Sequence, residues 1–222
     1  MARKYFSYLP NLEYIDRTQE GNYISDYTEV KNIFKRAKIR KDIFQDLQYF
    51  TKYQIIGDER PDNIAYKVYR DENLDWLVLL SNNIVNYENE WPLSQRSFDN
   101  YLIQKYGDYS SIYSAHHYET FQVRDSLGDE MIGEGLEVAS DFSITFYDRG
   151  LKQEVTKSEI YEVTNYDYEN RKQEEKRNIF LLKSEYLNLV ITDIESLMPY
   201  RQGSTQYVNP STVKGDNIRL FF

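Results

Sequence analysis

The stretch from Tyr49 to Asn83 constrains the fold more than any other part of the sequence. Aromatic or β-branched residues recur at every second position from Tyr49 to Ile55, which is the pattern of a β-strand. Pro61 follows where its fixed φ and missing N–H are tolerated, in the first turn of a helix. The sequence therefore predicts a strand over 49–56 and a short helix over 61–69.

A second short helix is predicted directly afterwards. Asp71 or Asn73 can cap its start, and Asn82 and Asn83 tolerate the left-handed conformation that ends a helix. Both helices carry an apolar stripe, so we expect a strand–helix–helix module with the core residues Ile64, Val68, Trp76, Leu77 and Leu80. Tyr69 and Trp76 could also stack on a sugar, but their helical spacing favours core packing.

The second half of the chain mixes helix and strand patterns. A third helix is expected from Ser94 to Gly107, and a small β subdomain over 108–150, around a glycine-rich acidic turn. Thr156 and Glu159 have capping-box spacing, and a charged helix over 167–177 would pair Asp167 with Arg171. A short strand over 179–182 and an amphipathic helix, capped by Ser184 and stopped by Pro199, complete the pattern.

Three segments are less regular. Residues 1–28 show no clear period and are interpreted as an extended arm, while residues 32–40 fit a helix or a strand, with the strand favoured. Residues 200–222 are polar but end in large apolar side chains, so we expect an arm that is mobile until its tip is buried on a neighbouring protein. The alternative is that the tip adds an edge strand to the chain's own β subdomain. The candidate interface residues are Tyr5, Phe6, Tyr8, Tyr207, Ile218, Leu220, Phe221 and Phe222.

The composition favours interfaces over binding of nucleic acid or membrane. The chain contains 22 Tyr among 222 residues, and Tyr suits surfaces that become buried on assembly, although core Tyr explains the excess equally well. A net charge of −9 opposes attraction to phosphate backbones and anionic lipids. The absence of Cys excludes disulfides and thiolate metal sites. We expect neither a signal peptide nor a membrane span, because the longest apolar stretch covers only 76–80.

The sequence also lacks an arrangement typical of an enzyme. His116 and His117 are the only histidines, and neighbours in a strand point to opposite faces, which makes them poor joint metal ligands. The pairs Asp58–Glu59 and Asp71–Glu72 could act as acid and base, but both flank a helix start, where carboxylates serve as caps. We therefore expect no catalytic residue, no cofactor and no metal.

The segment from Tyr53 to Tyr69, which contains Gly57-Asp58 before Pro61, resembles a LysM-like module together with its continuation over 73–83. With Trp91-Pro-Leu-Ser94 and Ile103-Gln-Lys-Tyr106, it resembles the small LysM-like baseplate wedge subunit of T-even-type contractile-tailed phages. The segments 33–57 and 169–198 extend this likeness on both sides.

The resemblance implies a structural protein of the virion baseplate, made in the host cytoplasm. It would bind other wedge proteins in a hetero-oligomeric sixfold assembly and help to join neighbouring wedges during tail assembly, with neighbouring copies of the wedge as a further candidate partner. Two alternatives are a LysM-type protein that binds cell-wall glycan and a peptidoglycan-degrading tail protein. The first is disfavoured because helical residues follow Trp91-Pro92-Leu93 where a glycan-binding module has its closing strand, and the second because no residues remain for a hydrolase domain.

The predicted fold class is α+β, with a LysM-like strand–helix–helix module, a small β subdomain, a C-terminal amphipathic helix and extended terminal arms. Its expected divisions are an N-terminal arm and strand region (1–48), the LysM-like module with the following helix (49–107), the β subdomain with the charged and amphipathic helices (108–198), and an extended C-terminal arm (199–222).

Overall fold

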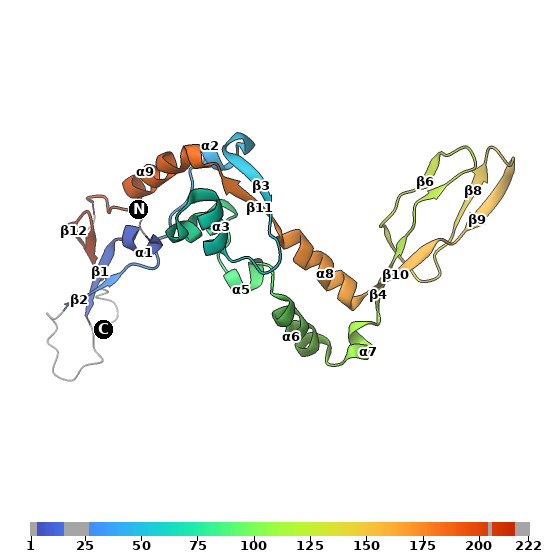
Figure 1. Cartoon of the computed structure of the whole chain (residues 1–222), viewed down its shortest axis with the longest axis horizontal. Coiled ribbons are helices and arrows are strands. Elements are labelled where there is room, and N and C mark those ends of the chain that lie inside the picture. Colours follow the sequence, from blue (N-terminus) through green and yellow to red (C-terminus); the bar gives the residue numbers. More distant parts are fainter. Residues whose placement is uncertain (1–3, 16–26, 204–205, 216–222) are drawn as a thin grey trace. The chain divides into compact units, whose positions relative to one another are not determined.

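The structure, a computed structural model, describes residues 4–15, 27–203 and 206–215, and it mixes helices and strands as expected of an α+β fold (Figure 1). The chain folds into two compact units. The core unit comprises Met1–Trp91 and Asn178–Phe222, and the inserted unit comprises Pro92–Arg177. The inserted unit therefore interrupts the sequence of the core unit. The division into four segments stays a prediction.

The core unit contains short helices and three-residue 3-10 turns between its strands. Its described elements are α1 (Tyr5–Tyr8), β1 (Asn11–Ile15), β2 (Tyr27–Lys31), α2 (Lys41–Phe44), η1 (Leu47–Tyr49), β3 (Phe50–Gln54), α3 (Pro61–Tyr69), η2 (Glu72–Leu74), α4 (Asp75–Ser81), α5 (Tyr87–Glu90), β11 (Asn178–Leu182), η3 (Ser184–Tyr186), α9 (Leu187–Leu197), β12 (Tyr207–Asn209) and β13 (Thr212–Lys214).

A strand–helix–helix–strand arrangement forms the centre of the core unit. β3 pairs antiparallel with β11 along its whole length, from Phe50 opposite Leu182 to Gln54 opposite Asn178. The side chain of Asn82, just after α4, extends this ladder because its amide nitrogen donates to Phe180 O at 2.9 Å and its oxygen accepts from Phe180 N at 2.7 Å. The strand that completes the module therefore follows the whole inserted unit in sequence.

Local sequence signals account for both central helices. Pro61 occupies the first turn of α3, and Arg70 ends it in the left-handed conformation, with φ of 61°. The Asp71 carboxylate caps η2 by accepting from Asn73 N at 3.0 Å, and Asn83, with φ of 53°, follows the end of α4. The predicted helix over 61–69 is confirmed.

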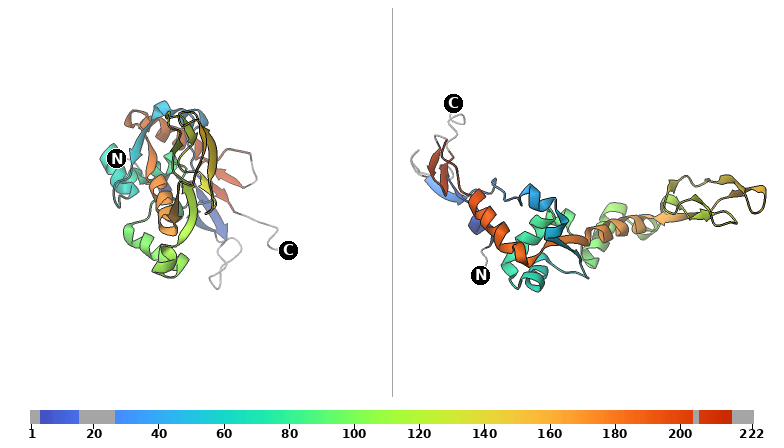
Figure 2. Two further views of the ribbon diagram at one scale, coloured as in Figure 1. Left: turned by 90° about the vertical axis from the view of Figure 1, so that its right-hand side faces the viewer. Right: turned by 90° about the horizontal axis from the view of Figure 1, so that it is seen from above.

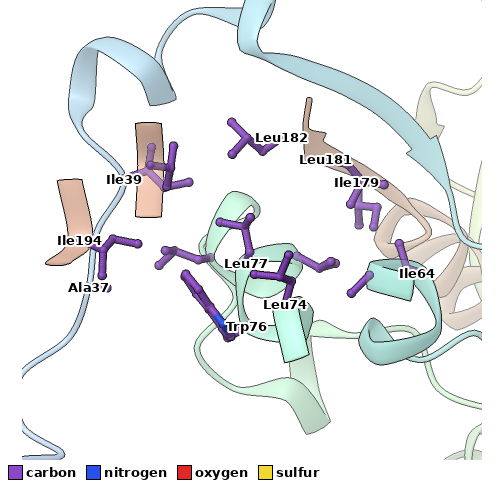
Figure 3. Packing of buried hydrophobic residues seen from close by; sticks show 14 of the residues in the cluster. Ala37, Ile39, Ile64, Leu74, Trp76, Leu77, Ile179, Leu181, Leu182 and Ile194 are labelled. Atoms are coloured by element: carbon purple, nitrogen blue, oxygen red, sulfur yellow. The ribbon is translucent and has the colours of Figure 1, made fainter. Parts of the chain in front are cut away.

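The apolar faces of these helices pack on β11 and α9 (Figure 3). Leu77 lies at the centre of the view, with Ile64 on one side and Ile194 on the other. Ile64 and Leu77 are completely buried, Trp76 and Leu80 nearly so, and Val68 is half-buried. All five predicted core positions thus belong to one apolar cluster, which also takes in β11.

The two ends of the described chain meet in a second sheet. Its strand order is β12-β13-β1-β2, in which β1 pairs parallel with β13 and antiparallel with β2 (Figure 2). Residues 1–28 and 200–222 were expected to be extended arms, and the structure places β1 and the hairpin 207–214 in this sheet instead. Pairing with β1 supplies the hydrogen bonds that the polar C-terminal segment cannot satisfy alone.

Other local predictions are corrected. Residues 32–40 form neither helix nor regular strand, because Ala37 and Ile39 are held by burial in the core rather than by a hydrogen-bonded ladder. Ser184 begins the 3-10 turn η3, and α9 starts at Leu187 without a side-chain cap.

The inserted unit combines a helical part with a β part. Its elements are α6 (Gln95–Tyr106), α7 (Tyr109–Ile112), β4 (Ala115–Thr120), β5 (Val123–Arg124), β6 (Glu130–Ile132), β7 (Glu137–Val138), β8 (Ile144–Asp148), β9 (Gln153–Lys157), β10 (Ile160–Thr164) and α8 (Asn165–Lys176).

Capping fixes the helices of the inserted unit. Ser94 caps α6 and Gly107, with φ of 90°, ends it, as predicted. Thr156 lies in β9, and the capping box is formed by Thr164 and Asp167 at the start of α8. A small apolar cluster of Phe98, Leu102 and Ile112 packs these helices together.

The β part of the inserted unit consists of the three-stranded sheet β10-β4-β7 and the hairpins β5–β6 and β8–β9. The two hairpins lie side by side (Figures 1 and 2), joined by the buried carboxylate of Asp148. It accepts from Ser126 N, Gly150 N and Leu151 N, each at 3.0 Å, and from the Ser126 hydroxyl. A Cβ at Gly150 would overlap the Ser126 hydroxyl oxygen, so a larger residue there would displace this hydroxyl from Asp148.

The buried carboxylate of Glu119 links β4, β10 and α8. It accepts from Arg171 Nη1 at 2.5 Å, from the Tyr161 hydroxyl at 2.5 Å and from His117 Nε2 at 2.9 Å. Arg171 therefore binds Glu119 rather than the expected Asp167. The hydrogen bond from Arg171 is the main reason why the pKa of Glu119 falls to about 2.

We predict that Leu77→Ala destabilises the protein by about 2 to 5 kcal/mol, since it leaves a cavity in a fully buried position. Chemical denaturation measures this loss. The matched control Leu47→Ala removes a side chain that is 67% exposed and should cost less than about 0.5 kcal/mol. Equal effects of the two substitutions would contradict the packing described above.

We also predict that Glu119→Gln lowers stability at neutral pH by about 1.5 to 3 kcal/mol, the usual value of hydrogen bonds to a charged group. Because folding lowers the pKa of Glu119 from 4.5 to about 2, its contribution is complete above pH 4.5 and is lost as the pH falls toward 2. Denaturation curves of the two proteins should converge over this range. The exposed Glu162→Gln serves as control, and a constant difference at all pH values would argue against the network.

Candidate functional site: a groove beside Trp76

The surface around Trp76 is built by α1 and α4. The rings of Tyr5 and Tyr8 lie 5.8 and 5.6 Å from the Trp76 ring, and Ala37 N donates to the Tyr5 hydroxyl at 3.0 Å. Tyr8 is consequently buried and Tyr5 half-buried by contacts within the chain, whereas Phe6 stays 61% exposed. Of these three candidate interface residues, Phe6 is the one that presents its side chain to solvent.

The other candidate interface residues lie near or beyond the C-terminal hairpin. Tyr207 is half-buried in β12, opposite Val213. Ile218, Leu220, Phe221 and Phe222 lie outside the described residues.

Two depressions flank Tyr5 and Trp76. The first, the Ile33 groove, has a volume of about 270 Å³, and its rim includes Ile33, Val85, Lys35 and Arg36. Ile33 and Val85 are 68% and 69% exposed, so apolar groups are accessible at its edge. The second has a volume of about 660 Å³ and an acidic rim. The indole nitrogen of Trp76, which lines both, is buried without a hydrogen-bond partner among the described residues.

A basic segment borders the Ile33 groove. Residues 31–41 contain six basic and no acidic residues, although the whole chain is acidic. Phe34, in the same segment, is 88% exposed. Lys35 Nζ donates to Met198 O at 2.5 Å, and burial, with a smaller effect of Arg201, lowers its pKa. The buried Ala37 and Ile39 hold this segment against the core.

Carboxylates neutralise only some of the basic side chains in this segment. Arg40 pairs with Asp42 and Asp193, whereas the described residues place no carboxylate within ion-pair distance of Arg36 or Lys38. The sequence analysis did not predict this surface, because it interpreted residues 32–40 only as a helix or a strand. The signal that could have found it is a basic run containing Ile33-Phe34 in an acidic chain.

The loop between β3 and α3 is closed by internal bonds. The Glu59 carboxylate accepts from the Tyr53 hydroxyl at 2.7 Å, from Ile56 N at 3.2 Å and from Lys67 Nζ, and Trp91 Nε1 donates to Glu59 O at 3.1 Å. Burial opposes ionisation of the Glu59 carboxyl, but the hydrogen bonds from Lys67, Tyr53 and Ile56 outweigh it and lower its pKa. Burial and Glu59 also raise the pKa of Tyr53 to about 12.

The two histidines do not point to opposite faces of β4 as expected. A register shift between Val163 and Thr164 leaves His116 as an extra residue in the ladder, and the Nδ1 atoms of His116 and His117 lie 2.8 Å apart. His116 stacks on Tyr168 with the ring centroids 3.9 Å apart. Among the described residues, no cluster of three or more potential metal-binding side chains occurs, and no helix there could cross a bilayer.

The Ile33 groove and its basic border are suited to protein binding, since they offer accessible apolar groups next to positive charge. Sequence comparison agrees with this interpretation. A family model described as "Base plate wedge protein 53" matches residues 4–124, a range that contains the groove and the basic segment. A comparison with curated proteins gives no match. Because the family model covers more than half of the chain, the protein belongs to the base plate wedge protein 53 family, the structural proteins of a phage tail baseplate.

Proposed function

We propose that this protein is a non-catalytic joint that binds other wedge proteins and helps to connect neighbouring wedges in a sixfold baseplate of the T-even type. Its assembly would begin in the host cytoplasm. The observation that carries the proposal is the exposure of Ile33 and Phe34 beside the Ile33 groove, inside the range matched by the wedge family.

A rigid support favours binding at this surface. Affinity at protein interfaces is concentrated in a few large side chains that become buried, and preorganised anchors lose little entropy. Two contacts support the backbone at Phe34: its amide donates to the Asn32 side chain at 3.1 Å, and Ala37 and Ile39, which follow it, are buried in the core. Its 88% exposure leaves the ring available to a partner.

The LysM-like likeness is part of the proposal and is supported by the order β3, α3, α4, β11. Two features favour protein binding over glycan binding. First, the closing strand β11 follows the inserted unit in sequence and does not come directly after the second helix. Second, the polar groups of Glu59 in the β3–α3 loop already form hydrogen bonds with Tyr53 and Trp91. A LysM-like module here would serve as a support for assembly contacts.

We predict that Phe34→Asp lowers incorporation of the protein into wedges by about tenfold or more, because a charge replaces an apolar anchor. Co-purification with the other wedge proteins from cells that produce them measures incorporation. The control Leu47→Asp changes a 67% exposed residue outside the groove and should incorporate normally. Normal incorporation of the Phe34 variant, or saturable sedimentation of the intact protein with peptidoglycan, would overturn the proposed function.

Deletion of residues 216–222 tests the apolar tip as a second anchor. The deletion leaves β12 and β13 in place, so the thermal stability of the monomer should not change, whereas incorporation into wedges should weaken. Thermal unfolding and the same co-purification measure the two effects. A truncated protein that melts much earlier would show that the tip serves the fold of its own chain, and unchanged incorporation would exclude it as an anchor.

A further inference from the structure

Charge is distributed unequally along this chain. The inserted unit contains 17 acidic and 10 basic residues, and so carries seven of the nine net negative charges. Within it, residues 125–148 contain seven acidic residues and no Lys or Arg. Its charge is opposite to that of the basic segment 31–41 in the core unit.

One turn of the acidic stretch presents an apolar side chain. In the turn 133–137, Leu136 is 52% exposed and lies between the exposed Glu134 and Glu137. The buried Thr120 fixes this turn, because its hydroxyl donates to Gly133 O at 2.8 Å and its backbone carbonyl accepts from Gly135 N at 2.8 Å. Thr120 N also donates to Leu136 O at 3.0 Å. The backbone that carries Leu136 is therefore fixed by hydrogen bonds within the chain.

The Ile33 groove has the complementary chemistry. Its walls include Ile33, Leu79, Ile84 and Val85, and Arg36 lies on its rim. One apolar side chain flanked by two carboxylates matches an apolar depression beside positive charge. Single exposed ion pairs add little affinity, but opposite patches steer association and select orientation.

We propose that the Leu136 turn of one copy docks into the Ile33 groove of a second copy. This inference rests on the proposed function and names one contact by which neighbouring wedges would be joined. Different surfaces meet in such a contact, so it is heterologous, and contacts of this kind close into rings when the rotation allows. A ring of copies would be compatible with the sixfold baseplate of the proposed function.

Leu136 fits the groove better than Leu127, an exposed leucine in the turn of the hairpin β5–β6. Leu127 is 64% exposed, but the neighbouring Asp129 already pairs with Arg149 at 3.3 Å. The carboxylates of Glu134 and Glu137 have no ion-pair partner among the described residues. Leu127 therefore provides a matched control in the same unit.

Site-specific cross-linking of the full chain tests the contact, and the absence of native Cys makes it specific. Val85→Cys is placed in one copy and Ser140→Cys in another, and the mixture is treated with a short bismaleimide. We expect linked heterodimers, identified by mass spectrometry of the joined peptides. Adding Leu136→Ser to the second copy should lower their yield about tenfold, whereas Leu127→Ser should not.

A charge exchange gives an independent measurement. Arg36→Glu with Lys38→Glu in the first copy should reduce the yield, and Glu134→Lys with Glu137→Lys in the second should restore it. Lys52→Glu, an exposed charge on β3, is the control for charge reversal. Equal yields with the Leu136 and Leu127 variants, failure of the exchange, or heterodimers no more abundant than with Asp99→Cys in place of Ser140→Cys would overturn the inference.

The same variants separate this inference from the proposed function. If Leu136→Ser enters wedges and particles normally while Phe34→Asp does not, the copy-to-copy contact is wrong and the role in wedge assembly stands. If both variants incorporate normally, the proposed function fails as well. Cross-links from Val85→Cys to a different baseplate protein would assign the groove to that partner instead.

Discussion

The core unit depends on the pairing of β3 with β11. This ladder joins residues that are separated in sequence by two helices and the entire inserted unit, and Asn82 extends it from the end of α4. Closing such a long loop costs chain entropy, which burial of Ile64, Leu77 and Leu182 in the same apolar core must offset. The completed core then supports α1 and residues 32–40, which form the groove beside Trp76.

The charged networks of the described residues hold elements of the fold together. The network around Glu119 joins a helix to a sheet, and its donors Arg171, Tyr161 and His117 belong to the same unit. The donors of Glu59 likewise fix a loop. The accessible features are apolar side chains next to charge, on the basic segment of the core unit and on the acidic turn of the inserted unit. Such pairs are suited to reversible, oriented assembly.

A large part of the local structure could be predicted from the sequence. Pro61, Ser94 and Gly107 mark helix ends by their backbone preferences, and alternation identified β3. These signals depend on neighbours within a few residues, whereas the capping signals expected at Thr156 and Ser184 gave way to a strand and a 3-10 turn. The family resemblance also gave the baseplate role, which the match over 4–124 supports.

The tertiary structure alone decided which distant segments meet. No local pattern could reveal that β11 completes the module, that β13 joins β1, or that His116 is an extra residue in its ladder, because strand pairing carries almost no local signature. The Ile33 groove could not be predicted for the same reason. Residues 32–40 lack periodicity, and only the burial of Ala37 and Ile39 in the core leaves Ile33 and Phe34 exposed to solvent. The sequence by itself determined the helix ends, the charge pattern and the apolar stripes. Long-range packing determined which of these side chains are buried in the core and which remain on the surface.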